Sequence, residues 1–361
     1  MTRATRAEIN LSALRHNLQV ARSHAQGSRQ PKQMAIIKAN GYGHGLVEVA
    51  QALSDADGFG VATIDEAIQL RDAGIQQPIL LLEGFNRPQD LLLIHSYNLQ
   101  CGIHNEEQIK ILEADASKPV QVWLKIDTGM HRLGFAPEQL STMFQRLSAI
   151  DKIQQPINLM THFACADDRK SDVTTQQHEK FKAVTAKFDQ AEKSLANSAG
   201  ILGWPDTHAD WVRPGIMLYG SSPFVGGSAK AHDLKPVMTL KSEIIAIHNF
   251  KKGDSIGYGQ SYSCEADMPV ATIAIGYGDG YPRHAATGTP VLINGVQAPL
   301  VGRVSMDMIS VDMRGVKKAN IGDEVILWGE GLPVERVAEK AETISYELFC
   351  GVTQRVNFSY L

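Results

Sequence analysis

An alternation of short apolar runs with helix-like stretches is the feature that most limits how this chain can fold. The apolar runs are residues 34–37, 58–62, 79–83, 120–126, 157–162 and 215–219, with weaker ones near Leu99 and Leu195. Between them lie stretches in which apolar residues recur at helical spacing. Because strands that alternate with helices are joined by crossovers, this pattern predicts a parallel sheet.

The number of units favours a closed barrel. About eight strand–helix units fit into residues 1–231, the usual length of an eight-stranded α/β barrel of the TIM type. A doubly wound open sheet is the alternative. A barrel would collect at one mouth the polar residues that follow its strands. These residues are Lys38, Lys125, His162, Ser198 and Arg213.

The pattern changes after a glycine-rich polar stretch at residues 224–233. Beyond it, β-like runs are separated by turn sequences, of which Asn294-Gly295 is a strong hairpin signal. Only residues 334–341 and 344–352 have helical patterns. A chain of 361 residues also exceeds what one core usually serves. We therefore predict an α/β barrel domain over residues 1–231 and a mainly β domain over residues 232–361.

Charge and composition argue against several classes of partner. The formal net charge is −4, without a run of like charges, so nothing predicts binding to nucleic acid or to a membrane. The start of the chain lacks the apolar segment of an export signal. Cys101, Cys165, Cys264 and Cys350 lie far apart, which argues against a zinc site and a disulfide framework. We expect a cytoplasmic protein without a metal, whose partners are small molecules or further copies of itself.

Lys38 ends an apolar run and is followed by a loop that contains Gly41, Gly43 and Gly45. Glycines allow tight turns or the close approach of a ligand. An ordinary loop lysine keeps its ammonium in water, whereas a desolvated lysine has a lowered pKa and forms Schiff bases with carbonyls. This segment alone leaves both interpretations open. Neither a dinucleotide-binding fingerprint nor a P-loop is present.

The stretch from Ala35 to Gly45, Ala-Ile-Ile-Lys-Ala-Asn-Gly-Tyr-Gly-His-Gly, resembles the signature of alanine racemases. The lysine of that family holds pyridoxal 5'-phosphate, so the resemblance implies that Lys38 is the cofactor lysine. It also implies that Tyr42 contacts the phosphate. Further motifs follow in the expected order over almost the whole chain. Gly41, where many members have alanine, is a mild departure.

Two further segments, residues 197–200 and 213–216, end predicted strands with residues suited to backbone N–H donation. Taken alone, they are equally well read as ordinary turns, and Arg213 as part of a surface ion pair. The resemblance implies that the cofactor phosphate is bound by Ser198, Gly215 and Ile216. It also implies that Arg213 contacts the pyridine nitrogen. Because arginine stays charged and cannot accept a proton, that nitrogen would remain unprotonated.

Lys125 and Arg132 are two cations seven residues apart, and they need an anion nearby. The resemblance implies that Arg132 contacts the cofactor phenolic oxygen and the substrate carboxylate, which suits its fork geometry. In the family the lysine is often carbamylated, which makes it an anion that can hold the arginine. Without this change Lys125 would repel Arg132, unless Asp127 or substrate intervenes. A solvated charge cluster is the alternative.

In the second domain Tyr258 stands between two glycines, an exposed setting in which a tyrosine has little to pack against. A tyrosine of a binding loop is the plain interpretation. The resemblance implies that Tyr258 is the second catalytic base and reaches the active site of the partner subunit. It also implies that Met306 contacts substrate and that Asp307 crosses the same interface. The other implied site residues are His162, which orients the tyrosine, and Tyr346, which narrows the pocket.

The leading hypothesis is an alanine racemase that interconverts L-alanine and D-alanine through a pyridoxal phosphate external aldimine. Lys38 would take the α-proton of D-alanine, and Tyr258 that of L-alanine, in a homodimer with shared active sites. The reaction would supply D-alanine for cell-wall peptidoglycan or feed alanine catabolism. One alternative is a racemase of broader specificity, since one methyl is worth only roughly 1–3 kcal/mol of discrimination. A non-catalytic pyridoxal phosphate carrier of the same barrel type and a barrel decarboxylase are the others.

Overall fold

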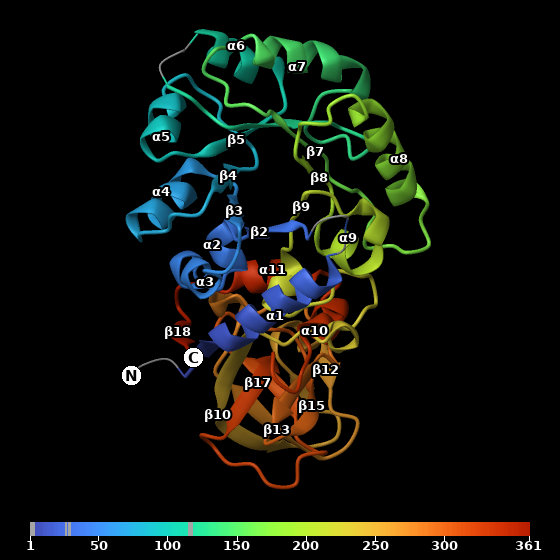
Figure 1. The fold of residues 1–361 in the computed structure, drawn as a ribbon. Coiled ribbons are helices and arrows are strands. Elements are labelled where there is room, and N and C mark those ends of the chain that lie inside the picture. The colour runs from blue at the N-terminus through green and yellow to red at the C-terminus, as the bar shows by residue number, and fades with distance from the viewer. Residues whose placement is uncertain (1–3, 26, 28–29, 115–117) are drawn as a thin grey trace. The chain divides into compact units, whose positions relative to one another are not determined.

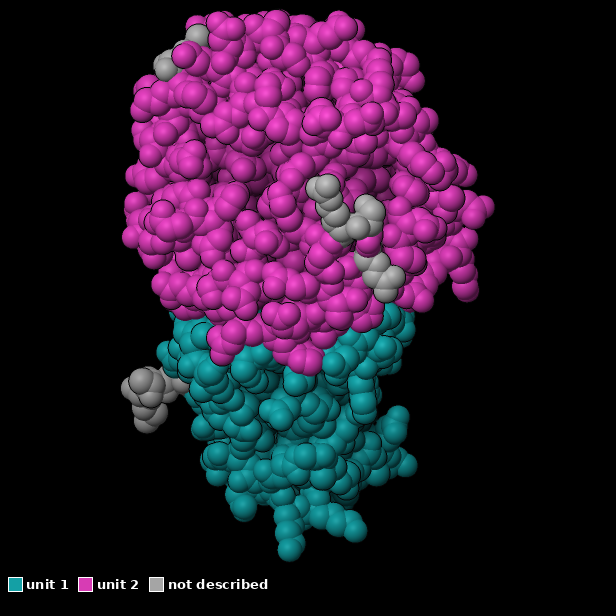
Figure 2. Space-filling model, in the orientation of Figure 1, with its two compact units in different colours: residues 1–14, 219–222, 226–361 teal, residues 15–218, 223–225 magenta. Residues whose placement is uncertain are grey.

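The computed structural model describes residues 4–25, 27, 30–114 and 118–361. The chain divides into two compact units (Figure 2). One, called here the barrel unit, consists of residues 15–218 and 223–225. The other, called here the β unit, consists of residues 1–14, 219–222 and 226–361. The domain boundary between residues 231 and 232 stays a prediction.

The barrel unit is built on a closed ring of eight strands, and each strand pairs in parallel with its neighbours. In ring order the strands are β2 (Lys32–Ile36), β3 (Gly58–Val61), β4 (Ile79–Leu81), β5 (Gln100–Ile103), β6 (Val122–Lys125), β7 (Asn158–Met160), β8 (Lys193–Ser194) and β9 (Trp211–Val212). β2 closes the ring by pairing with β9. The predicted eight-stranded α/β barrel is therefore confirmed, and the open sheet is ruled out.

Helices connect the strands and lie around the outside of the ring (Figure 1). They are α3 (Leu46–Ala52), α4 (Ile64–Asp72), α5 (Asp90–Ser96), α6 (Glu106–Ala114), α7 (Leu140–Ser148), α8 (Val173–Thr185) and α9 (Ser198–Gly203), and α1 (Leu11–His24) precedes β2. The start of α4 is fixed by a capping box, in which Thr63 and Glu66 exchange side-chain to backbone hydrogen bonds. Among the described helices, none is both long and apolar enough to cross a membrane.

One predicted strand is wrong. Residues 215–219 were expected to form a strand, but Ile216–Tyr219 form a short 3-10 helix, η3, and β9 comes earlier. The Leu218 N–H donates to the Gly215 carbonyl at 2.8 Å, as a helical turn requires. Every residue of η3 is buried, so its sequence is apolar throughout. An apolar run of this length does not distinguish a buried strand from a buried helical turn.

The β unit contains an eight-stranded sheet in the order β13-β16-β15-β14-β17-β10-β1-β18. Because β13 also pairs with β10, the first six strands of this order form a closed circuit. The strands are β1 (Arg6–Ile9), β10 (Met238–Phe250), β13 (Met268–Ile273), β14 (Pro290–Ile293), β15 (Val296–Val301), β16 (Ile309–Asp312), β17 (Glu324–Trp328) and β18 (Asn357–Tyr360). Two helices, α10 (Val334–Lys340) and α11 (Ser345–Gly351), follow β17. The mainly β character of the C-terminal region is confirmed.

The hairpin predicted at Asn294-Gly295 joins β14 to β15, with Ile293 opposite Val296. Asn294 has φ 50° and Gly295 has φ 77°. Two consecutive positive φ values match the twist of the flanking strands, and asparagine and glycine tolerate them best.

We predict that Phe59→Ala lowers the free energy of unfolding by about 3–5 kcal/mol, because Phe59 on β3 is fully buried and its removal leaves a cavity. The matched control is Leu92→Ala on the exposed face of α5, which should change stability by less than about 0.5 kcal/mol. Urea unfolding curves measure both. Equal effects of the two substitutions would contradict the assignment of Phe59 to the barrel core.

Candidate active site

Lys38 begins an unusual left-handed turn, α2 (Lys38–Tyr42). The φ values of Ala39, Asn40, Gly41 and Tyr42 are 53°, 55°, 61° and 52°. In the left-handed helical conformation an L-residue brings its Cβ too close to the following carbonyl oxygen, at roughly 1–2 kcal/mol per residue. The glycines of this segment predicted a loop, and the structure agrees that the segment is not a right-handed helix. Its strain has to be offset by contacts around it.

Hydrogen bonds on both sides hold this turn. The Gly41 N–H donates to the Ile37 carbonyl at 2.8 Å. The Asn40 side chain accepts from the Leu46 N–H at 3.0 Å, and the Asn40 N–H donates to Glu66 at 3.4 Å. Such strain persists in proteins where the surroundings over-determine the backbone, and it clusters at functional sites. The turn therefore fixes the backbone from which the Lys38 amine projects.

The predicted polar residues of the barrel follow the carboxyl ends of its strands. Since all eight strands are parallel, these ends lie at one mouth. The residues are Lys38 after β2, Lys125 at the end of β6, His162 after β7, Ser198 after β8 and Arg213 after β9. Arg132 lies in the loop after β6, and it lines a small pocket with Lys125, Asp127 and His162. The structure thus gathers the predicted cations at one place.

Lys125 shows how crowded with positive charge this mouth is. Its side chain is buried, and its pKa is lowered from the ordinary 10.5 to about 8, mainly by desolvation. The positive charges of Arg213, Arg132 and Lys38 contribute to this lowering of the pKa, and the Glu83 carboxylate acts against it. The ammonium is therefore poorly stabilised, and an anion that entered the mouth would stabilise it.

Arg213 is buried, so the alternative of a surface ion pair is wrong. Its guanidinium donates to the Ser194 hydroxyl at 2.5 Å and to the carbonyls of Thr161 and Leu195 at 2.6 and 3.1 Å. Burial lowers the pKa of Arg213 to about 10, which leaves it protonated at neutral pH. It therefore acts at the mouth as a donor of hydrogen bonds and never as an acceptor.

His162 is neutral, because desolvation and then the charge of Arg213 hold its pKa well below the ordinary value. Arg213 Nη2 lies 3.4 Å from His162 Nδ1. Since a guanidinium only donates, Nδ1 is the acceptor and the ring proton is on Nε2. His162 can therefore donate one hydrogen bond to a further group.

A polar cradle lies beside these charges. The Ser198 hydroxyl accepts from the backbone N–H groups of Gly215 and Met217, at 2.8 and 3.3 Å. A Cβ at position 215 would stand 2.9 Å from the Tyr42 hydroxyl, so only glycine leaves this space open. Ile216 is buried next to it. Hydroxyls, N–H groups and an adjacent excess of positive charge together suit a phosphate.

Two polar residues of the mouth were missed by the sequence analysis. Glu83 follows β4 and is the carboxylate that raises the pKa of Lys125. His104 follows β5, donates from Nε2 to the Glu83 carbonyl at 3.0 Å, and has a pKa lowered mainly by desolvation. Glu83 is the last residue of a predicted strand and His104 follows a weaker one, which was the available signal. Asp127, one of the two groups that could have intervened between Lys125 and Arg132, accepts from the N–H groups of Gly129 and His131 in its own loop.

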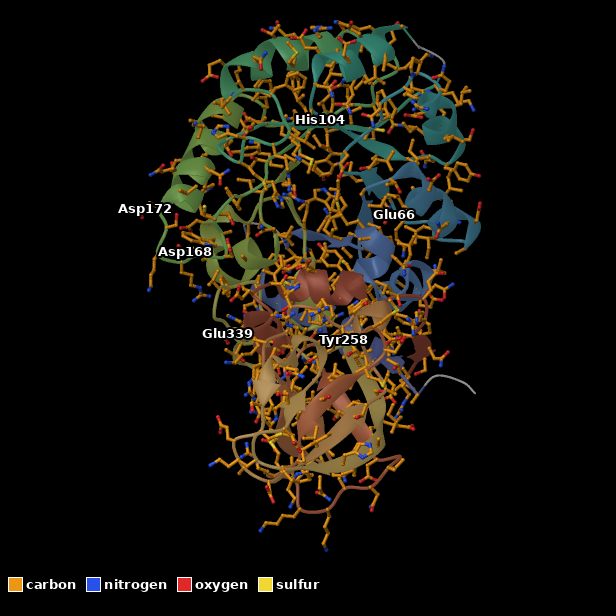
Figure 3. All side chains as sticks on the ribbon, turned by 180° about the vertical axis from the view of Figure 1, so that it is seen from behind. Glu66, His104, Asp168, Asp172, Tyr258 and Glu339 are labelled. Atoms are coloured by element: carbon orange, nitrogen blue, oxygen red, sulfur yellow. The ribbon has the colours of Figure 1, made fainter. Side chains whose placement is uncertain are left out.

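In the β unit, Tyr258 lies at the tip of a small hairpin and is labelled in Figure 3. The hairpin pairs β11 (Ser255–Ile256) with β12 (Tyr262–Ser263). Ile256 anchors it in a cluster of buried residues that includes Met268 and Val301. The tyrosine side chain itself is 67% exposed. An anchored hairpin therefore presents a phenol outside the core, where it is available to another surface.

The other three predicted residues of the β unit are not in its core. Met306 is 52% exposed, and Asp307 and Tyr346 are half-buried. Met306 and Asp307 lie in the loop between β15 and β16, and Tyr346 lies on α11. Met308 in the same loop is also exposed, so this loop presents two apolar side chains on the surface of the β unit.

Comparison with known proteins gives one consistent result. Residues 9–223 match the model of the N-terminal domain of alanine racemase, and residues 237–360 match that of its C-terminal domain. An alanine racemase of Coxiella burnetii is 51% identical over 366 residues, which covers 99% of both chains. The crystal structure of the biosynthetic alanine racemase from Pseudomonas aeruginosa superimposes with a TM-score of 0.96 at 44% identity, over 100% of both chains. The alanine racemase structure from Acinetobacter baumannii gives 0.92 at 36% identity, again over 100% of both chains.

We predict that Lys125→Met stabilises the cofactor-free protein at pH 7 by up to roughly 3 kcal/mol. The unfolded chain keeps the Lys125 proton up to its ordinary pKa of 10.5, whereas the folded protein loses it above about 8. The cost of the buried ammonium is therefore full below pH 8 and disappears as the pH rises to 10.5. Denaturant midpoints of both proteins between pH 7 and 10.5, in buffers freed of carbon dioxide, measure this difference. A difference that stayed constant with pH would contradict the prediction.

Proposed function

The chain belongs to the alanine racemase family, and on that premise we propose that it interconverts L-alanine and D-alanine with pyridoxal 5'-phosphate as its cofactor. The observation that carries the proposal is Lys38, a primary amine on a strained and fixed turn, at a barrel mouth crowded with cations. An amine so placed suits a covalent bond to a carbonyl, and the surrounding cations suit an anionic partner.

The residues of the mouth fit such a cofactor. Ser198, Gly215, Ile216 and Tyr42 would hold its phosphate in the polar cradle, with Lys38 as the covalent tether. When bound, the cofactor withdraws electrons from the substrate and so acidifies its Cα–H bond. Arg213 would donate a hydrogen bond to the ring nitrogen and, because it stays charged, would keep a proton off that nitrogen.

Arg132 would bind the carboxylate of alanine by its planar fork. It faces the charge of Lys125, whose pKa of about 8 leaves part of its amine neutral near neutral pH. A neutral amine is the form that adds carbon dioxide to become a carbamate. We propose this change at Lys125, because it would convert a repulsive neighbour of Arg132 into an anion that orients it.

Two bases would move the α-proton. Lys38 would remove or return it on one face of Cα, and Tyr258 of the partner subunit on the other. His162 would donate from Nε2 to the phenolic oxygen and so stabilise the deprotonated tyrosine. The exposure of Tyr258 and Met306 supports a homodimer with shared active sites, because both side chains would then contact the partner subunit.

The cell would use this reaction to supply D-alanine for peptidoglycan or to break alanine down. The similarity to a structure described as biosynthetic favours supply. The four cysteines, all within the described residues, form no disulfide, which suits the reducing cytoplasm, where we place the protein. Broader amino-acid specificity stays an alternative, which rates measured on larger substrates would test. A non-catalytic carrier would bind the cofactor at Lys38 without racemising alanine.

We expect Lys38→Ala to lose racemase activity in both directions and to lose covalent retention of the cofactor. Borohydride treatment of the wild type should fix the cofactor to the peptide that contains Lys38, and peptide mapping shows whether it does. Lys110→Ala, an exposed lysine on α6, is the matched control and should behave as wild type. Racemisation by Lys38→Ala at the wild-type rate would refute the assignment. Labelling of Lys38 without racemisation by the wild type would favour the carrier.

A second prediction tests the shared site. Losing either base should reduce the rate by about 10²–10⁴-fold, so Lys38→Ala and Tyr258→Phe should each be nearly inactive. When their subunits exchange at random, half the dimers are mixed, and each mixed dimer has one intact site of two. Activity should therefore recover to about a quarter of wild type. If native mass spectrometry shows exchange and activity does not recover, both bases belong to one subunit.

A further inference from the structure

A segment near the C-terminus, residues 351–355, packs against a turn of the β unit. The turn is η6 (Tyr277–Asp279), which follows β13. The Thr353 hydroxyl donates to the Gly278 carbonyl at 2.9 Å, and the Thr353 N–H donates to the Asp279 carbonyl at 3.1 Å. The chain end therefore fixes the backbone of η6.

The same turn holds the loop that carries Met306 and Asp307. The Tyr277 N–H donates to the Ser305 carbonyl at 3.0 Å, and the Gly278 N–H donates to the Met306 carbonyl at 2.8 Å. The Met306 side chain is exposed, so packing of that side chain does not hold the loop. Backbone hydrogen bonds from η6 hold the loop instead.

Arg355 adds a side-chain bridge between η6 and the loop that carries Met306 and Asp307. Its Nε lies 3.5 Å from Asp279 Oδ1, and its Nη2 donates to Asp307 Oδ1. Asp279 is fully buried, and its other oxygen accepts from the Gly276 N–H at 2.9 Å. The half-exposed Asp307 is therefore connected through one guanidinium to a carboxylate that cannot move.

The fit of the guanidinium depends on a glycine. A Cβ at position 278 would lie 2.2 Å from Arg355 Nη1 and 3.0 Å from the Met306 carbonyl oxygen. Any other residue there would displace the guanidinium or the loop. Gly278 thus accommodates both the bridge and the hydrogen bond to Met306.

We propose that Arg355 is a positioning residue for racemisation, which holds the loop of Met306 and Asp307 in place. The inference rests on the proposed function, in which Met306 helps to complete the partner's site. Arg355 touches neither substrate nor cofactor. Without it, the loop loses its side-chain link to the buried carboxylate of Asp279.

The first test is Arg355→Gln in the holoenzyme. We expect kcat/KM for alanine to fall roughly tenfold to a hundredfold, since small displacements of positioning groups have effects of this size. The larger change should be in KM, because a displaced Met306 loop would weaken the contact with substrate. The matched control is Arg314→Gln, since Arg314 is also 41% exposed and pairs with Asp312 at 2.7 Å in the same unit. The control should keep wild-type kinetics.

A double-mutant cycle shows whether Arg355 acts through Asp307. Asp307→Asn removes the carboxylate that Arg355 binds, so Arg355→Gln should cost little more in that background. Independent effects, which multiply in the double variant, would overturn the proposal. So would an Arg355→Gln variant with a lowered melting temperature but unchanged kcat/KM while it is folded, because its role would then be structural.

Arg355→Lys keeps the proposal testable if the loss of the cation beside Asp279 prevents folding. One ammonium can pair with Asp279 or with Asp307 but cannot bridge both, so the KM should rise, though less than in Arg355→Gln. A wild-type KM in Arg355→Lys would show that bridging Asp279 and Asp307 does not matter for substrate binding, and would overturn the proposal. Borohydride labelling of Lys38 should be unchanged in these variants. If the wild type fails to racemise alanine, the proposed function is refuted. If the wild type is active and the Arg355 variants are unaffected, only this inference is refuted.

Discussion

The buried guanidinium of Arg213 is the constraint on which the barrel mouth depends. A buried charge has to be satisfied by hydrogen bonds, and Arg213, which follows β9, finds its partners at the ends of the two preceding strands, at Thr161 after β7 and at Ser194 and Leu195 at the end of β8. These hydrogen bonds stabilise the buried charge and fix the direction in which the guanidinium points. Desolvation and then the Arg213 charge keep His162 neutral, and the same charge helps to lower the pKa of Lys125. One residue thus connects the packing of the barrel with the protonation of its site.

The resulting excess of positive charge is the link from structure to chemistry. Lys38, Lys125, Arg132 and Arg213 face one mouth, where Glu83 is a counter-charge to Lys125. A protein bears such repulsion where an anion compensates it, and a phosphate-bearing cofactor and a carboxylate substrate are both anions. The left-handed turn at Lys38 is strained as well, and its strain is offset by hydrogen bonds that fix the backbone that carries the amine.

The β unit builds its proposed site residues in a different way. Tyr258 and Met306 are exposed, so their backbones have to be held while their side chains remain available. A hairpin anchored by Ile256 holds the first, and hydrogen bonds from η6 hold the second. Exposed side chains on fixed backbones suit a surface that another subunit completes, whereas the excess positive charge of the barrel mouth suits an anionic ligand.

By itself the sequence determined the periodic pattern of the barrel, the Asn294-Gly295 hairpin and the motif around Lys38, because each depends on neighbours within a few residues. It did not distinguish the helical turn at residues 216–219 from a strand, since burial makes both apolar. Only the tertiary structure decided that Asp127 turns to its own backbone and that Arg355 bridges Asp279 and Asp307. The physical reason is that burial and charge act through space, between residues that the fold brings together and that no local pattern relates.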